Sequence, residues 1–196
     1  MLEEKINSDL FFDTKLPGVT SVLSSVFGKD EFNGIPEAVM KAATDRGHAV
    51  HSYIEYYIKN NEWPEIELSY QIYIDYFKEW LEKYKPIFMS SELKLISEEL
   101  GYKGIIDTIF KYTNDEGKEI ICMCDWKTSS SLNRFKTMMQ LNMYKELFNQ
   151  YFPDINIDEI RTLSITKNEW RFSKFEINKE FVNAILLFNR LKNEYR

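Results

Sequence analysis

Residues 101–128 read GYKGIIDTIFKYTNDEGKEIICMCDWKT, and this stretch predicts two strands joined by a short loop. Isoleucine and aromatic residues dominate 105–112, and a second apolar run follows at 119–125. Both compositions are typical of strands. The intervening residues 114–117, Asn-Asp-Glu-Gly, favour a type I turn closed by a left-handed glycine, because Gly117 has no Cβ to clash. The stretch therefore predicts a β-hairpin.

The hairpin carries acidic residues inside its apolar runs, and the strand register decides where they lie. If Asn114 pairs with Lys118, Asp107 lies opposite Asp125, and directly opposed Cβ atoms are about 4.5–5.5 Å apart. Asp125 and Lys127 share a face because side chains alternate along a strand. Two carboxylates this close repel each other unless a cation or a shared proton relieves them. A hard divalent cation such as Mg²⁺ suits these oxygen ligands, whereas a register shift of one residue would separate the aspartates.

Composition and charge fit one soluble globular domain spanning residues 1–196. The chain is 44% hydrophobic and 29% charged, with enough length for a substantial core. It contains no apolar run of about 20 residues, which a membrane span requires, and its first residues lack the apolar segment of a signal peptide. Cys122 and Cys124 lie two apart on one predicted strand, which disfavours a mutual disulfide. We therefore expect a cytoplasmic protein.

The net charge of −6 argues against a nucleic-acid role, because proteins that bind the nucleic-acid backbone usually have a basic surface. A total charge hides its distribution, however, and a basic stripe can lie on an acidic body. Acidic metal ligands also add to the negative total.

The remaining elements predict an α/β fold, with a mixed central sheet flanked by helices and a mainly helical N-terminal portion of about 1–86. A strand, a helix and another strand follow one another in the middle of the chain, which permits a parallel pair. The predicted elements are a short helix capped by Thr20, a loop at 29–36, helices at about 37–60 and 67–85, a strand at 88–98, the hairpin, a helix at about 132–152, strands at 159–166 and 169–177, and a helix capped by Asn178.

Several polar side chains on the predicted helices are candidates for function. His51 and Glu55 are four residues apart and share a helix face, just after an interruption that we expect at residues 46–48. His51 is either a partly buried polar residue or a metal ligand. Gln140 and Tyr144 share a face in the same way, whereas for Arg134 and Lys136 we favour a solvated helix end. The aromatic face of 67–85 is interpreted as core packing.

Five fragments in this order resemble the PD-(D/E)XK nuclease superfamily, and within it the RecB-type and phage-type exonucleases; the chain is also similar to the mitochondrial genome maintenance exonuclease. They are PGVTSVL at 17–23, Gly47-x-x-x-His51-x-x-x-Glu55, GIID at 104–107, DWKTS at 125–129 and Gln140-x-x-x-Tyr144. Two features depart from the family. Ile106, not proline, precedes the first aspartate, and the four cysteines of the iron–sulfur relatives are missing. We therefore expect no iron–sulfur cluster and expect Cys122 and Cys124 to face the core.

The resemblance implies a restriction-endonuclease-like core with a site for one or two Mg²⁺ or Mn²⁺ ions. It assigns metal ligation to His51, Asp107, Asp125 and the backbone carbonyl of Trp126, and it places Lys127 beside the attacked phosphate. The alternative for this centre is a salt bridge from Lys127 to one aspartate, which leaves the other carboxylate unpaired.

The resemblance also suggests supporting residues around this centre. Gln140 and Tyr144 would position the attacking water or a DNA phosphate. Glu55 and Glu92 either assist the site or are surface carboxylates, and for Glu92 we favour the surface. Arg134 and Lys136 become candidates for contacts with the DNA backbone.

The implied function is a metal-dependent DNA exonuclease, encoded by a bacterium or phage, in recombination, repair or phage DNA processing. Its partner would be DNA with free ends, single-stranded because the relatives that it resembles use it; no membrane and no particular protein partner is indicated. Two alternatives stay open. One is a structure- or sequence-directed endonuclease on the same scaffold, and the other is a non-catalytic DNA-binding or assembly module.

Overall fold

The computed structural model describes residues 2, 8–28, 34–129 and 131–194. Most of the loop expected at 29–36 lies outside these residues. The centre of the fold is a five-stranded mixed sheet with the strand order β1-β2-β3-β4-β5. The strands are β1 (Ile87–Ser97), β2 (Tyr102–Thr113), β3 (Glu119–Lys127), β4 (Glu159–Ile165) and β5 (Trp170–Phe175).

The sheet contains the parallel pair that the sequence permits. Strands β3 and β4 run parallel, and the other neighbours are antiparallel. Helix α5 (Arg134–Tyr151) lies between β3 and β4 in the chain and supplies the crossover that a parallel pair requires. The predicted α/β class and mixed sheet are therefore confirmed.

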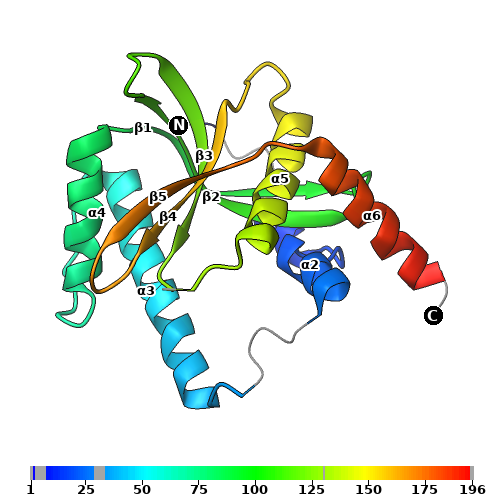
Figure 1. The fold of residues 1–196 in the computed structure, drawn as a ribbon, viewed down its shortest axis with the longest axis horizontal. Helices are drawn as coiled ribbons and strands as arrows, with labels where there is room; N and C mark the ends of the chain where they lie inside the picture. The colour runs from blue at the N-terminus through cyan, green and yellow to red at the C-terminus, as the bar shows by residue number, and fades with distance from the viewer. Residues whose placement is uncertain (1, 3–7, 29–33, 130, 195–196) are drawn as a thin grey trace.

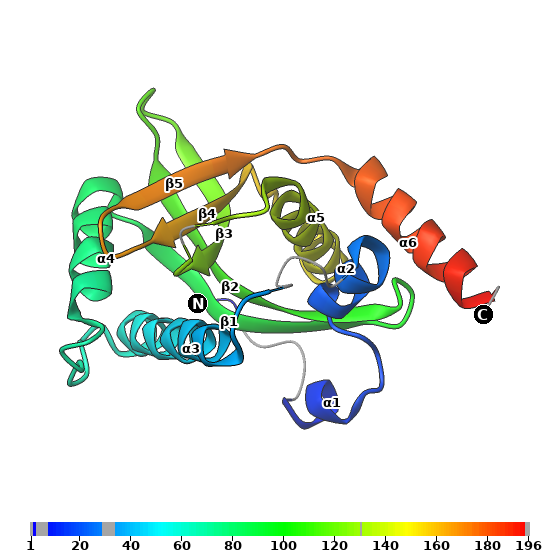
Figure 2. The ribbon, with the colours of Figure 1, turned by 60° about the horizontal axis from the view of Figure 1, so that its bottom comes forward.

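Helices cover both faces of the sheet (Figures 1 and 2). Helices α3 (Glu37–Asn60) and α4 (Gln71–Tyr84) lie against one face, and α5 lies against the other together with α2 (Val19–Phe27) and α6 (Lys179–Glu194). The short helix α1 (Ser8–Asp13) contacts β1. The sheet thus separates two hydrophobic cores.

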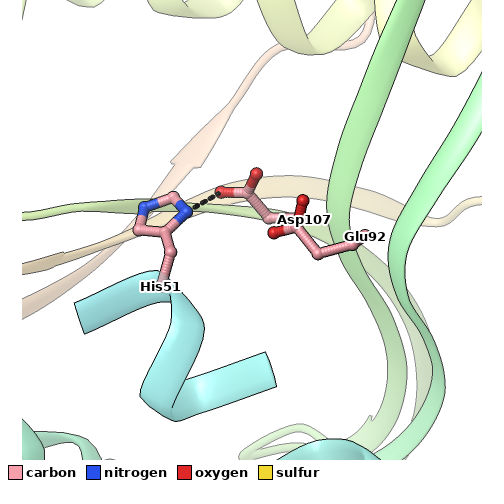
Figure 3. Close-up of side chains that lie close together, drawn as sticks. All are labelled: His51, Glu92 and Asp107. Atoms are coloured by element: carbon pink, nitrogen blue, oxygen red, sulfur yellow. Dashed lines mark ion pairs between the residues drawn. The ribbon is translucent and has the colours of Figure 1, made fainter. Parts of the chain in front are cut away.

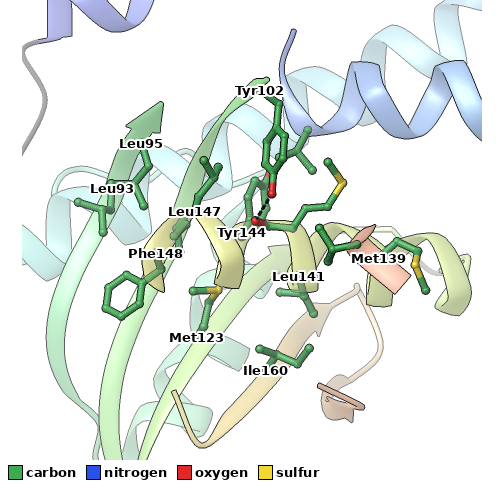
Figure 4. Packing of buried hydrophobic residues seen from close by; sticks show 14 of the residues in the cluster. Leu93, Leu95, Tyr102, Met123, Met139, Leu141, Tyr144, Leu147, Phe148 and Ile160 are labelled. Atoms are coloured by element: carbon green, nitrogen blue, oxygen red, sulfur yellow. Dashed lines mark hydrogen bonds between the residues drawn. The ribbon is translucent and has the colours of Figure 1, made fainter. Parts of the chain in front are cut away.

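Side chains alternate between the two faces of the sheet along β2 and β3, so both strands contribute residues to both cores. Met123 packs with Leu147 and other apolar residues of α5 (Figure 4). Ile109 belongs to the same core. On the opposite face, the core combines Phe110, Cys122, Cys124 and Trp126 with Phe77 and Trp80 of α4. Both cysteines are buried and free, as expected, and the predicted core role of the aromatic face of α4 is confirmed.

The central hairpin has the predicted turn and register. Asn114 N donates to Lys118 O over 2.9 Å, Gly117 N donates to Asn114 O over 2.9 Å, and Gly117 has a φ of +79°. The ladder then runs from Thr113 opposite Glu119 to Thr108 opposite Cys124. This confirms the register on which the opposition of Asp107 and Asp125 depends.

Several predicted boundaries are wrong. Helix α2 begins at Val19 with Gly18 as its N-cap, not Thr20, because Gly18 is held by a backbone bridge to Lys103 and its carbonyl accepts from Val22 N. Helix α3 is continuous through Gly47, so the expected interruption is absent. Helix α4 begins at Gln71 because hydrogen-bonded turns occupy the preceding residues. Helix α1 was not predicted.

Candidate active site

The candidate site lies where the β2–β3 ladder ends. The last pair in the described ladder is Thr108 opposite Cys124. One residue further, the side chain of Asp107 replaces the backbone as acceptor, and its Oδ2 receives a hydrogen bond of 2.7 Å from Trp126 N. Asp107 and Asp125 follow this pair directly on their two strands. The sheet therefore presents two carboxylates at the point where its pairing stops.

Three elements bring potential metal ligands together here. His51 of α3, Glu92 of β1 and Asp107 of β2 each offer one ligand atom, and these atoms all lie within 4.8 Å of one another (Figure 3). His51 Nδ1 is 3.7 Å from Asp107 Oδ2. The surface position favoured for Glu92 from sequence is therefore wrong.

Glu92 reaches the cluster through an unusual backbone conformation. Its φ of +50° lies in the left-handed region in the middle of a strand, which is uncommon for a residue with a Cβ and is typical of functional sites. Ser91 pairs with Thr108 and Leu93 pairs with Ile106. Glu92 therefore faces Asp107 from β1, on the side of β2 that is away from β3. The sequence carries no local signal for this conformation, because the position holds neither glycine nor asparagine.

The imidazole of His51 is oriented by the backbone of β3. Its Nε2 lies 3.0 Å from Trp126 O, and because a carbonyl can only accept, Nε2 carries the proton. Burial lowers the pKa of His51, despite the opposing charge of Asp125 and the bond to Trp126. A neutral ring with this tautomer directs the lone pair of Nδ1 toward Asp107.

Asp125 and Lys127 form an ion pair at the same edge. Lys127 Nζ is 2.7 Å from Asp125 Oδ2, and Asp125 is only 4% exposed. This oxygen has no partner besides Lys127 among the described residues. Burial by itself lowers the pKa of Lys127, but the charges of Asp125 and Asp107 outweigh it and raise the pKa. The Lys127 salt bridge considered from sequence is present, and it leaves Asp107 without a cationic side chain as partner among the described residues.

The cluster holds more negative charge than its own side chains neutralise. Burial, followed by the charges of Asp125 and Glu92, raises the pKa of Asp107 well above its usual range. Burial, followed by the charge of Glu55, raises the pKa of Glu92 to about 7. A divalent cation would relieve both carboxylates, and a set of carboxylate oxygens and one imidazole nitrogen suits Mg²⁺ or Mn²⁺. The residues present therefore fit a metal site.

Two departures from the expected ligand set are visible. The compact group contains Glu92, whereas Asp125 is paired with Lys127. The Trp126 carbonyl, expected as a ligand, accepts the hydrogen bond of His51. An ion held by His51 Nδ1 would leave that bond in place.

Gln140 and Tyr144 lie beside Lys127, on the face of α5 that the sequence predicts. Lys127 Nζ donates to Gln140 Oε1 over 3.5 Å, and Gln140 Nε2 donates to Tyr144 Oη over 3.0 Å. A Cβ on Gly104 would lie 2.7 Å from Tyr144 Cε1 and 3.2 Å from Leu147 Cδ1. The glycine of the GIID fragment therefore makes room for the Tyr144 ring.

The other candidates lie at the margin of the site. Glu55 forms an ion pair of 2.6 Å with Lys59 and acts on Glu92 only through its charge. Arg134 is exposed at the start of α5, where its Cζ lies 4.9 Å from the centre of the Phe175 ring. Lys136 lines a hollow with Lys127 and Gln140.

The sequence matches no protein-family model and no curated protein. Its structure is similar to that of a candidate exonuclease from Eubacterium rectale, with a TM-score of 0.52 and 13% identity over 98% of this chain and 85% of that chain. The two proteins share a fold. An alkaline exonuclease from Laribacter hongkongensis aligns with a TM-score of 0.46 and 10% identity, over 96% of this chain and 95% of that one.

None of the described helices is long and apolar enough to cross a lipid bilayer.

Proposed function

We propose that this chain is a metal-dependent DNA exonuclease that hydrolyses phosphodiester bonds. The observation that carries the proposal is the convergence of His51, Glu92 and Asp107 beside the Asp125–Lys127 ion pair. The shared fold with a candidate exonuclease supports it, as does the order of the five sequence fragments.

His51, Glu92, Asp107 and Asp125 would hold one or two Mg²⁺ or Mn²⁺ ions. Such an ion, when bound, lowers the pKa of a water molecule and neutralises phosphate charge. The pKa of Lys127 is raised, so its Nζ stays an ammonium at neutral pH and offsets the charge that develops on the phosphate oxygens. It is poorly suited to act as a base.

Gln140 and Tyr144 are positioning residues in this proposal. The Gln140 amide accepts from Lys127 and donates to Tyr144, so it restricts where the ammonium lies. The buried Tyr144 ring fixes the amide in turn, because its own position is set by Gly104 and Leu147.

We infer that the substrate is DNA with free ends, preferentially single-stranded, in recombination, repair or phage DNA processing in the cytoplasm. The motif resemblance supports these finer points. A covalently closed single-stranded circle tests the need for an end, because an endonuclease cuts it and an exonuclease leaves it intact.

The central test is digestion of end-labelled single- and double-stranded DNA with Mg²⁺ or Mn²⁺. We expect EDTA to abolish digestion, and Asp125→Asn or Lys127→Ala to lower the rate by at least about 100-fold. Asp115→Asn, which removes a carboxylate from the exposed hairpin turn, is the matched control and should retain wild-type activity. Wild-type digestion by an Asp125→Ala, Lys127→Ala double variant purified free of host nucleases would refute the proposal. Calorimetry that detects no Mn²⁺ binding would instead favour a non-catalytic module.

A further inference from the structure

A hollow of about 320 Å³ adjoins the candidate site on the side of β4 and β5. It is lined by residues of β4 and β5, of the turn between them, and of the segment that leads into α5. Its lining is rich in hydroxyl and guanidinium groups. The residues that matter below are Ser129, Arg134, Ser164, Glu169, Arg171 and Ser173.

The sheet register connects this hollow to Lys127. Lys127 pairs with Ser164 across the parallel β3–β4 ladder, and Ser164 pairs with Arg171 across the β4–β5 ladder. Residues paired in this way point to the same face, and adjacent strands lie about 4.8 Å apart. Lys127, Ser164 and Arg171 therefore form one row that leads from the candidate site into the hollow.

A second hollow lies beside Lys127, the residue that the row and the candidate site share. It has a volume of about 210 Å³, is lined by Lys127 and Gln140, and shares Ser129 and Leu132 with the first hollow. The two hollows therefore meet at the loop between β3 and α5.

The chemistry of the first hollow suits a phosphodiester group. Arg134 is held over the Phe175 ring, with 4.9 Å from its Cζ to the ring centre, and Arg171 forms an ion pair with Glu169. The hydroxyls of Ser164 and Ser173 have no hydrogen-bond partner within the described part of the chain. Guanidinium and hydroxyl donors are the usual ligands of backbone phosphates and carry no base specificity.

We propose that this hollow binds a backbone phosphate of the nucleic-acid strand whose neighbouring linkage lies at Lys127. The proposal rests on the proposed function, because it takes Lys127 as the place of the attacked phosphate. On binding, Arg171 exchanges the Glu169 carboxylate for the phosphate, and Ser164 and Ser173 donate to it. Glu169 therefore opposes binding.

The test measures the affinity of a fluorescent single-stranded oligonucleotide as a function of salt, with Asp125→Asn as a slow-cleaving background. We expect Arg171→Ala to weaken binding about 5–10-fold and to reduce the slope of log K against log salt by about 0.7, the value for one phosphate contact on a single strand. Lys167→Ala removes the same charge from the exposed β4–β5 turn and should change the affinity less than about twofold. Glu169→Gln should strengthen binding, a sign that general loss of structure cannot produce.

A small substrate separates this proposal from the proposed function. Thymidine 5′-(p-nitrophenyl phosphate) has a single phosphodiester and cannot reach the hollow, so Arg171→Ala with Asp125 intact should hydrolyse it at the wild-type rate. If the wild type fails to hydrolyse both this compound and DNA, the proposed function fails, and the oligonucleotide affinities still decide the hollow. Unchanged affinity and salt slope in Arg171→Ala, or weaker binding by Glu169→Gln, would overturn the phosphate site.

Discussion

At the scale of single residues, Glu92 links stability to function. Its pKa rises from 4.5 to about 7 in the folded protein, so between these pH values the folded state binds more protons than the unfolded state. The free energy of unfolding therefore falls as pH rises through this window, and the loss is complete above it. In EDTA at pH 8, Glu92→Gln should raise the free energy of unfolding by about 1–3 kcal/mol, as measured by urea denaturation.

The same substitution should weaken the metal site. We expect Glu92→Gln to lower Mn²⁺ affinity by about 10–100-fold in calorimetry and to lower the nuclease rate with it. Glu55→Gln is the matched control, because Glu55 pairs with Lys59 outside the compact group, and its effect should be several-fold smaller. A Glu92 variant that is neither more stable without metal nor weaker in Mn²⁺ binding would contradict a ligand role.

Alanine substitutions at two glycines should change stability in opposite directions. A Cβ on Gly104 would lie 2.7 Å from the Tyr144 ring, whereas a Cβ on Gly47 would be in ordinary contact, 3.7 Å from Thr128 Oγ1. Gly104→Ala should therefore lower the free energy of unfolding by about 1–3 kcal/mol. It should also slow digestion, because Tyr144 must move and Gln140 with it.

Gly47→Ala, in the interior of α3, should raise the free energy of unfolding by about 0.5–1 kcal/mol. Urea denaturation of both variants measures the difference. Equal effects of the same sign would show that the Tyr144 ring does not depend on the space at Gly104.

At the scale of elements, local chemistry explains which parts could be predicted from sequence. The hairpin register is set by a turn that Gly117 closes, so the pairing of β2 with β3 as far as Thr108 and Cys124 could be predicted from neighbouring residues alone. The position of Glu92 depends on the left-handed conformation in β1, which no glycine or asparagine signals. The hydrogen bond from His51 to Trp126 depends on how α3 packs on the sheet, which spacing within one helix cannot specify.

A second polar cluster ties β2, β4 and β5 together away from the candidate site. Glu159 accepts from Tyr112 Oη at 2.7 Å, from Arg161 Nε at 2.6 Å and from Lys174 Nζ at 2.8 Å. Burial opposes its charge, but the bonds from Arg161, Lys174 and Tyr112 outweigh burial and lower the pKa of Glu159 to about 2. This cluster fixes the β4–β5 hairpin that carries the proposed phosphate hollow.

The depressed pKa of Glu159 predicts sensitivity to acid. The stabilisation is fully present above the unfolded pKa of about 4.5 and is lost as pH falls toward 2, because the unfolded state then binds more protons. Glu159→Gln should lower the free energy of unfolding by about 1–3 kcal/mol at pH 7. Thermal unfolding at a series of pH values should show that the difference in the free energy of unfolding between this variant and the wild type shrinks toward pH 2. A constant difference across this range would show that the charge of Glu159 does not stabilise the fold.

At the scale of the whole molecule, the candidate site joins the two cores. His51 belongs to the helical layer of α3, Glu92 and Asp107 to β1 and β2, and Lys127 contacts Gln140 in α5 on the other face. A cation held by the first three residues would therefore connect α3 to the sheet. Binding to the folded state alone stabilises it by about 2.7 kcal/mol when the ion is present at 100 times its dissociation constant.

The last prediction is a metal-dependent melting temperature. For a chain of this size, 1 kcal/mol shifts the melting temperature by about 2–4 °C, so saturating Mn²⁺ should raise it by about 5–10 °C. Asp107→Asn should abolish most of this shift, because Asp107 faces both His51 and Glu92, whereas Asp115→Asn in the exposed turn should leave it unchanged. Differential scanning calorimetry with matched ionic strength measures the effect. A shift of the same size in Asp107→Asn would place the ion elsewhere, and the acidic cluster would then need another explanation.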